Sequence, residues 1–344
     1  MNIDRLNEQQ LALLTKLIKE NERVVVCAHK SPDGDAIGSI LAWASFLSQQ
    51  NKHVVCVVPD QAPDFLTWLP KFQTILRFDK QPEEVKQAFN QADLVCCLDF
   101  NETARVEELQ PIIESCSAPR LLIDHHVSPN IPSTLAISCP DACSTCEIVF
   151  SLIWQLGGYN NLTHDMAVCL YCGMMTDTGG FTFASTRPQI FYIISLLLEK
   201  GINKDLIYNR VFHNYSLWAL RFRSYILLNK LRVLETLHAS YFLVSHNEMK
   251  RFHFVKGDLE GLVNIPLVMK GHKLSISLRE DTYNHHRILI SLRSSCDFHC
   301  REMAVRFFNG GGHEDAAGGH LDCTLEEAEQ IALHAIMAYK EELS

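Results

Sequence analysis

Short runs of β-branched and aliphatic residues alternate with stretches of helical periodicity in the first half of the chain, and this alternation restricts the fold most strongly. Such runs occupy residues 23–28, 53–58, 93–99 and 120–124. The first, RVVVCA, lacks polar alternation, as expected of a strand buried on both faces. A helical pattern over residues 36–50 separates the first two runs. This order predicts an α/β domain whose mostly parallel sheet is wrapped by helices.

The second half of the chain is organised differently. Helical patterns fill residues 144–156, 164–175, 188–200 and 217–237, strand patterns follow at 241–245, 273–279 and 288–293, and a helix is expected at 325–343. We therefore expect three parts: a larger domain over 1–195, a helical connector over 196–239, and a smaller C-terminal α/β domain over 240–344.

Carboxylates and imidazoles directly follow four of these apolar segments. They are His29, Asp33 and Asp35 after the first strand, Asp99 at the third, Asp124, His125 and His126 at the fourth, and Asp177 after the helix over 164–175. The carboxyl ends of parallel strands converge on one crevice, so we expect these side chains to meet there. Five aspartates in one crevice would repel each other and resist desolvation, and divalent cations would neutralise them where imidazoles alone would not.

Mixed carboxylate and imidazole ligands without thiolates suit Mn²⁺, Mg²⁺ or a comparable ion better than a structural zinc. Two ions about 3.5–4 Å apart, bridged by one carboxylate, would form a hydrolytic site for phosphoryl groups. Taken singly, an aspartate at a strand end is more often a helix N-cap or a solvated turn residue, and a lone histidine more often has a structural role. The combination of residue types and strand-end positions is what favours the metal site.

Charge and composition exclude several classes of protein. The formal net charge is −9, from 31 Lys+Arg and 40 Asp+Glu, which argues against a surface that grips long duplex nucleic acid. No run of about 18 uncharged apolar residues is present, so we expect no membrane span. The N-terminal residues lack the pattern of a secretory signal. Most of the 13 cysteines lie in apolar runs, which is typical of a reducing compartment and predicts a cytoplasmic protein.

Five motifs, in order along the chain, resemble the DHH/DHHA1 phosphoesterase family. They are HKSPDGDAIGS (29–39), Asp99 with Arg105 in DFNETAR, DHH (124–126), TDTGGF (176–181) and GGGHEDAAGG (310–319). The resemblance covers nearly the whole chain and is strongest to the branch of oligoribonucleases that also act as 3′-phosphoadenosine 5′-phosphate phosphatases. It implies a catalytic DHH domain, a substrate-binding DHHA1 domain and an active site in the cleft between them.

The resemblance also implies roles for single residues. The ligands of one metal would be His29, Asp33 and the bridging Asp99, and those of the other would be Asp35, Asp99, His125 and Asp177. His126 would face the substrate phosphate or the attacking water. Asp124 would orient the neighbouring metal-bound histidine. These two residues and Asp99 form the expected catalytic set.

Substrate contacts are expected from both domains. Arg105 either clamps a phosphate or is a solvated helix residue. The glycines over 310–312 either present backbone N–H groups to an anion or simply end a helix. The resemblance favours substrate binding by Gly310, Gly311, Gly312, His313 and Arg293, and Arg279 is a weaker analogue of Arg293.

The implied activity is metal-dependent hydrolysis of short oligoribonucleotides and linear dinucleotides to mononucleotides, together with removal of a phosphate from 3′-phosphoadenosine 5′-phosphate. Two Mn²⁺ ions are the expected cofactors, with Mg²⁺ and Co²⁺ as alternatives. The alternative enzymatic functions are those of an inorganic pyrophosphatase or exopolyphosphatase and of a RecJ-like single-strand exonuclease. The alternative without catalysis is a metal-dependent nucleotide-binding regulator. The expected partners are short RNA or nucleotides, and family members are often dimers, which makes a homodimer the candidate assembly.

Overall fold

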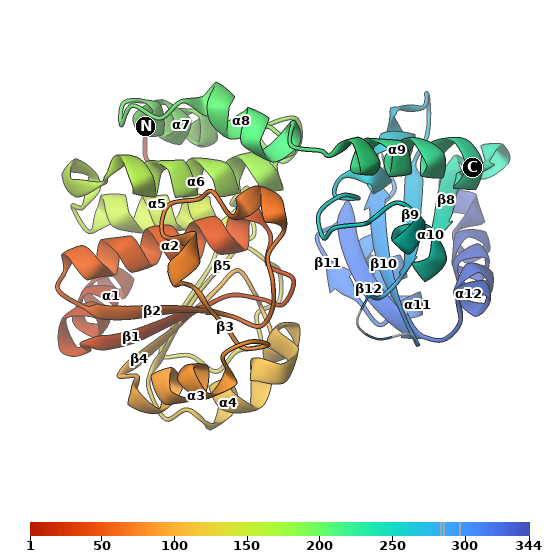
Figure 1. Ribbon diagram of the computed structural model, residues 1–344. Helices are drawn as coiled ribbons and strands as arrows, with labels where there is room; N and C mark the ends of the chain where they lie inside the picture. The colour runs from red at the N-terminus through yellow and green to blue at the C-terminus, as the bar shows by residue number, and fades with distance from the viewer. Residues whose placement is uncertain (283, 285, 296) are drawn as a thin grey trace. The chain divides into compact units, whose positions relative to one another are not determined.

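The computed structural model describes residues 1–282, 284, 286–295 and 297–344 and divides into two units, Met1–Asn214 and Tyr215–Ser344 (Figure 1). The division falls inside the segment predicted as a connector. Helix α8 (Lys204–Phe212) packs against α6 in unit 1, whereas α9 (Leu217–Tyr225) belongs to unit 2. Each unit has its own sheet and its own hydrophobic core.

Unit 1 contains a six-stranded sheet in the order β3-β2-β1-β4-β5-β6. All neighbouring strands are parallel, which confirms the predicted sheet. The strands are β1 (Arg23–Cys27), β2 (His53–Val58), β3 (Leu76–Arg77), β4 (Leu94–Leu98), β5 (Arg120–Asp124) and β6 (Leu135–Ser138). The strand order reverses between β1 and β4, and such a switch point leaves a crevice at the carboxyl ends of the two strands.

Helices cover both faces of this sheet. Helices α2 (Gly34–Gln49), α5 (Thr145–Gln155) and α6 (His164–Asp177) lie on one side, and α3 (Pro82–Gln91) and α4 (Gln110–Ser115) on the other (Figure 1). Strand β1 contributes side chains to the hydrophobic cores on both faces of the sheet, because Val26 packs in the core beneath α2 and Val25 packs in the core beneath α3. The remaining elements of this unit are α1 (Glu8–Glu20), α7 (Pro188–Leu198) and the 3-10 turns η1 (Asp64–Leu66), η2 (Phe72–Thr74), η3 (Thr103–Leu109) and η4 (Tyr159–Asn161).

Unit 2 contains a mixed sheet in the order β11-β12-β10-β9-β8-β7, in which only β8 and β9 are parallel. Its strands are β7 (Arg232–Leu234), β8 (Ala239–Val244), β9 (Leu274–Glu280), β10 (Arg287–Ser294), β11 (Gly311–Gly312) and β12 (Ala316–Asp322). Helices α11 (Arg301–Phe307) and α12 (Leu325–Ala338) build the core on one face. On the other face, α9, α10 (His246–Arg251) and the 3-10 segment η7 (Leu262–Val268) pack on β8.

Two predicted helices differ from the structure. The helix predicted over 217–237 ends after α9 and one π-helical turn, η5 (Ile226–Lys230), and the chain then forms β7 and the turn η6 (Glu235–Leu237). The edge strand β7 forms because its backbone hydrogen-bonds to β8, a tertiary contact that overrides local helical propensity. The closing helix predicted over 325–343 is interrupted at Tyr339, between α12 and α13 (Lys340–Leu343).

Among the described residues, no helix is both long and apolar enough to cross a membrane. The cysteines of the apolar runs are free thiols within the cores, as predicted. Burial raises the pKa of the Cys56 thiol to about 12, so this residue behaves as a small hydrophobe.

Candidate metal centre and active site

The loop after β1 brings His29 to the switch point. Its Nδ1 lies 2.8 Å from the Lys30 carbonyl oxygen, which favours the tautomer that donates from Nδ1 and leaves Nε2 as an acceptor. This Nε2 faces Asp99 Oδ2 at 3.5 Å and Asp33 Oδ1 at 3.9 Å. Burial opposes protonation of His29, but the hydrogen bond to Asp99 raises the pKa of the imidazole.

Asp33 is the N-cap of helix α2, a common structural role of an aspartate after a strand, and it also borders the site. Its Oδ1 caps α2 by accepting from the amides of Asp35 and Ala36, both at 3.0 Å. The carboxylate is 53% exposed. Helix α2 therefore begins at Gly34, two residues before the start predicted from the helical pattern over residues 36–50.

Asp35 lies in the first turn of α2 and points to the N-terminus of a second helix. Its two oxygens accept hydrogen bonds from the α5 amides of Thr145, at 2.6 Å, and Cys146, at 2.8 Å. The partial positive charge of a helix N-terminus stabilises a carboxylate in this position. Burial, and then the negative charges of Asp99 and Asp177, nevertheless raise the pKa of Asp35 well above its ordinary value. The ionised form of this group needs positive charge nearby.

Asp99 follows β4 at the centre of the cluster and is 2% exposed. Its Oδ2 faces His29, and its Oδ1 lies 3.4 Å from His125 Nε2. Burial works against ionisation, yet the imidazoles of His125 and His29 hold the pKa of Asp99 well below its ordinary value. The Thr145 hydroxyl donates to Oδ1 at 3.0 Å. Asp99 therefore offers each of its oxygens to a different side of the crevice.

Asp124, the last residue of β5, and the two histidines that follow it face different partners. His125 Nε2 lies 3.8 Å from Asp35, 3.4 Å from Asp99 and 3.6 Å from Asp177. Burial alone would disfavour its protonation, but Asp177 and Asp99 raise the pKa of His125 well above the ordinary value. The second histidine, His126, places its Nδ1 2.7 Å from Asp124 Oδ1.

Asp124 therefore orients His126, whereas we predicted that it orients the preceding, metal-facing histidine. The Nδ1 of His125 instead faces the Ala142 carbonyl oxygen at 3.4 Å. On the other side of His126, Nε2 lies 2.7 Å from the Arg105 guanidinium, so the histidine donates from Nδ1 and accepts at Nε2. Burial, together with the Arg105 charge, lowers the pKa of His126.

These side chains have the donor set and spacing of a divalent cation site. Three groups each place ligand atoms within 4.8 Å of one another: His29, Asp33 and Asp99; Asp35, His125 and Asp177; and Asp99, Asp124 and His126. Ligands bound to one cation at about 2.0–2.2 Å lie about 3–3.5 Å apart, and most distances between the imidazoles and the carboxylates are close to this. Within the described part of the chain, the buried Asp124 Oδ2 has no hydrogen-bond partner, which also suits a nearby cation.

Close packing of α2 on α6 positions two of these carboxylates. A Cβ on Gly38 would lie 2.5 Å from the Cys169 carbonyl oxygen, and one on Gly173 would lie 3.1 Å from the Asp35 Cα. Only glycine lets the helices approach this closely. Asp35 at the start of α2 and Asp177 at the end of α6 consequently reach the same imidazole.

The sequence reasoning missed Thr145, which contacts both Asp35 and Asp99. Its position at the start of a helix was readable from the N-cap Ser144, but the fold alone brings that helix end to the crevice. The unit 1 residues predicted for the site lie together. The predicted residues that belong to the second compact unit are Arg293, Gly310, Gly311, Gly312 and His313.

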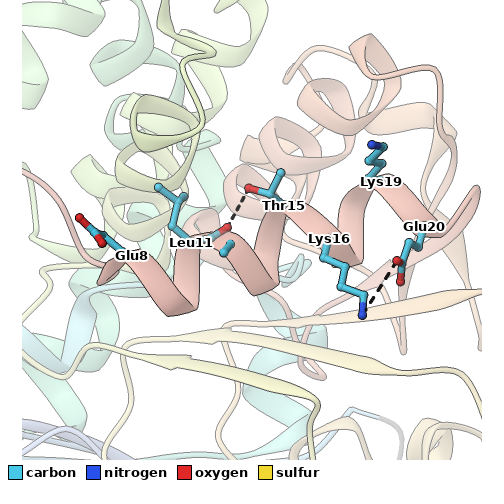
Figure 2. Close-up of a pocket in the computed structure, with 7 residues that line it drawn as sticks. Glu8, Leu11, Thr15, Lys16, Lys19 and Glu20 are labelled. Atoms are coloured by element: carbon cyan, nitrogen blue, oxygen red, sulfur yellow. Dashed lines mark hydrogen bonds and ion pairs between the residues drawn. The ribbon is translucent and has the colours of Figure 1, made fainter.

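A hollow elsewhere in unit 1 contains none of these residues. It measures about 600 Å³ and lies along the solvent-facing side of α1 (Figure 2). Three of its polar side chains are engaged with α1 itself, since Thr15 donates to the Leu11 carbonyl oxygen and Lys16 pairs with Glu20 at 4.0 Å. Nothing in this hollow combines a nucleophile, a base and a metal ligand.

Comparison with known proteins assigns part of the chain to a family. A profile described as "DHH family, N-terminal domain" matches residues 23–174. A protein of Thermus thermophilus named "Bifunctional oligoribonuclease and PAP phosphatase NrnA" is 28% identical over 342 residues, covering 98% of this chain and 95% of the relative. Residues 23–174 of this chain therefore match the N-terminal domain of the DHH family.

Solved structures support the same fold. A protein of Bacteroides fragilis described as exopolyphosphatase-related is 42% identical, superposes with a TM-score of 0.91, and is covered over 98% of both chains. RecJ of Thermus thermophilus, solved in complex with Mn²⁺, gives a TM-score of 0.54 at 11% identity, with 100% of this chain matched to 56% of that one. The similarity to RecJ shows a shared fold and nothing further.

Proposed function

We propose that this protein is a metal-dependent phosphoesterase that hydrolyses short oligoribonucleotides and linear dinucleotides to mononucleotides and dephosphorylates 3′-phosphoadenosine 5′-phosphate. The DHH family and the name of the Thermus relative indicate a phosphoesterase hydrolase. The observation that carries the proposal is the buried Asp99, which has an imidazole facing each of its two oxygens. A carboxylate with this environment is suited to bridge two cations.

We assign two divalent cations to this cluster, Mn²⁺ with Mg²⁺ or Co²⁺ as alternatives. His29 and Asp33 would hold one ion, Asp35, His125 and Asp177 the other, and Asp99 both. When bound, such cations lower the pKa of a water molecule and neutralise charge on phosphoryl oxygens. The mixture of oxygen and imidazole ligands, with no thiolate among them, supports this choice of ions.

Arg105 and His126 would act on the substrate. A guanidinium has five N–H donors, and one contact of Arg105 is to His126, so the remaining donors can bind phosphate oxygens. The hydrogen bond to Asp124 fixes the orientation of the His126 ring. In this orientation the Nε2 lone pair of His126 points at the Arg105 guanidinium. A phosphate bound to Arg105 would meet His126 at the same place.

Unit 2 would supply contacts to the nucleotide through Arg293, Gly310, Gly311, Gly312 and His313. Consecutive glycines let backbone N–H groups approach an anion closely. A homodimer and a cytoplasmic location remain predictions of the sequence. They are tested by light scattering of the purified protein and by fractionation of cells that express it.

A substrate panel tests the proposal. The Mn²⁺-loaded protein is incubated separately with pyrophosphate, polyphosphate, 3′-phosphoadenosine 5′-phosphate, a 5′-phosphorylated dinucleotide and a 24-mer RNA. We expect mononucleotide from the dinucleotide and inorganic phosphate from the bisphosphate, both abolished by excess chelator. Turnover of pyrophosphate or polyphosphate alone would overturn the proposal and favour the activity in the Bacteroides protein's name. Fast degradation of the 24-mer with little action on dinucleotides would favour a RecJ-like exonuclease, and tight nucleotide binding without product would favour a regulator.

A further inference from the structure

The first turn of α5 contacts two of the carboxylates assigned to the cations. The amides of Thr145 and Cys146 donate to the two oxygens of Asp35. The hydroxyl of Thr145, which is fully buried, donates to Asp99 Oδ1 at 3.0 Å. Thr145 thus contacts one carboxylate through its backbone and the other through its side chain. A displacement of this helix start would disturb both carboxylates at once.

The loop that precedes α5 also contacts the end of β5, where the histidine that faces both carboxylates is carried. The Ala142 carbonyl oxygen lies 3.4 Å from Nδ1 of His125. The Cys139 amide donates to the Asp124 carbonyl oxygen at 3.0 Å. The position of the short segment 139–146 therefore governs the geometry of the cluster from several sides.

Four charged side chains form a network around this segment. Glu147, in the first turn of α5, is 1% exposed and accepts hydrogen bonds from the guanidinium groups of Arg5 and Arg187. Its Oε2 also accepts from the Cys143 amide at 2.8 Å. Asp141 pairs with Arg5 at 2.6 Å and lies 3.6 Å from Arg187. The two acids and the two arginines are named the Glu147 network.

The Glu147 network joins parts of the chain that are far apart in sequence. Arg5 precedes α1, and Arg187 is the N-cap residue of α7. At the other end of α5, Gln155 Oε1 accepts from the amides of Arg5 at 2.8 Å and Leu6 at 3.0 Å. The segment before α1 is therefore fastened to both ends of α5, and the network fixes where this helix begins.

Stability alone does not explain these buried charges. Ser144 already caps α5 by accepting from the Glu147 amide at 3.1 Å. A buried ion pair often adds no more stability than well-packed apolar residues of the same volume, whereas it can specify one arrangement of the groups that it joins. A network that touches the loop of the cation cluster is well placed for such a role.

We propose that Glu147 is a positioning residue of the metal centre. With its two arginines, it fixes the start of α5. Thr145 in turn holds Asp35 and Asp99 in the orientation that suits two cations. This inference rests on the proposed function, because it concerns the ligands of the cations assigned there. It makes the affinity for the metal depend on a carboxylate that binds no metal itself.

Calorimetric titration of the full chain with Mn²⁺ tests this role in Glu147→Gln and Thr145→Val. Glutamine keeps the size of the side chain and an acceptor for the Cys143 amide, but it removes the charge between the arginines. Valine keeps the branched shape and the backbone amide, but it removes the hydroxyl that donates to Asp99. We expect the Kd for Mn²⁺ to rise about ten- to hundredfold in each variant, as is typical when a group that orients a metal ligand is lost.

Three further variants separate positioning from folding. Thr145→Ser keeps the hydroxyl and should restore nearly the affinity of the unmodified protein. Thr163→Val is the matched control, because Thr163 also begins a helix, α6, by accepting from the Met166 amide at 3.2 Å but is exposed and lies outside the cluster. It should lower the unfolding temperature and leave the Kd for Mn²⁺ unchanged. If Glu147→Gln does not fold, Arg5→Met replaces it and should also raise the Kd.

A double variant tests whether Glu147 acts through Thr145. Residues that act through one another are not additive, so the Kd of the double variant Glu147→Gln, Thr145→Val should rise by less than the product of the two single fold-changes. Fold-changes that multiply would reject the link between the two residues.

The outcomes distinguish this inference from the proposed function. An unchanged Kd for Mn²⁺ in Glu147→Gln, or in Arg5→Met where that variant replaces it, would overturn the positioning role and leave the proposed function standing. If the unmodified protein binds Mn²⁺ but hydrolyses none of the nucleotide substrates, the proposed function fails, and the titrations still decide the role of Glu147. Absence of Mn²⁺ binding by the unmodified protein would overturn both.

Discussion

The backbone at Asp99 has a φ of 66°, in the left-handed region. Aspartate and asparagine tolerate this conformation better than other residues with a Cβ. The Asp99→Asn variant therefore keeps the local backbone and the size of the side chain while it removes the charge between His29 and His125. The asparagine variant therefore tests the role of the carboxylate charge without disturbing the backbone at residue 99, which an alanine variant would not do as well.

We expect Asp99→Asn to lower the rate of dinucleotide hydrolysis by about 100-fold or more, since a ligand shared by two cations is lost. Calorimetry should also show weaker Mn²⁺ binding, and circular dichroism should show an intact fold. Asp165→Asn is the control, because Asp165 is exposed in the first turn of α6 and lies outside the cluster. A near-normal rate in Asp99→Asn would reject the bridging assignment.

At the scale of elements, the contact between α2 and α6 governs the geometry of the site. We expect Gly38→Ala to destabilise the protein by about 1–3 kcal/mol, as overpacking does, because the new methyl group meets the Cys169 carbonyl oxygen and this backbone atom cannot rotate away. The gain in helix propensity, about 1 kcal/mol, is smaller. Urea unfolding measures the change, with the exposed Ser48→Ala of the same helix as control. An unchanged or higher midpoint in Gly38→Ala would show that the helices adjust.

The elements also show what could be predicted from the sequence. Strands β1 and β4 were predictable because burial on both faces requires an unbroken apolar run. The two-residue β3 and the glycine-containing β12 have little strand propensity of their own and exist because they pair with β2 and β10. The clustering of the site residues was predictable because they lie at the ends of parallel strands. The hydrogen-bond partner of Asp124 was not, because it depends on the directions of the side chains after β5, which no pattern of residue types encodes.

At the scale of the whole molecule, the cation cluster couples stability to metal. When both are ionised, the buried Asp35 and Asp99 repel each other, and a bound cation would neutralise these charges. Ligand at 100 times its Kd stabilises a folded state by about 2.7 kcal/mol, and we expect Mn²⁺ at that excess to raise the unfolding temperature accordingly. Calorimetric scans with Mn²⁺ and with chelator measure the shift.

The shift should be confined to unit 1. Among the described residues, no group of metal-ligating side chains lies entirely within unit 2. Where the scan resolves two transitions, only one should respond to Mn²⁺, and neither should respond in Asp99→Asn. Equal shifts of both transitions, or none, would contradict the assignment of the cations to the switch point of the parallel sheet.

The assigned cation ligands begin at His29 and end at Asp177, and none of the loops that carry them holds enough of them by itself. A short excised peptide cannot reproduce the coordination, and a nascent chain cannot assemble it before α6 has left the ribosome. Uptake of manganese during synthesis would thus be a late event that reports the completed first unit. A fluorescent manganese probe added to stalled chains of increasing length would time it.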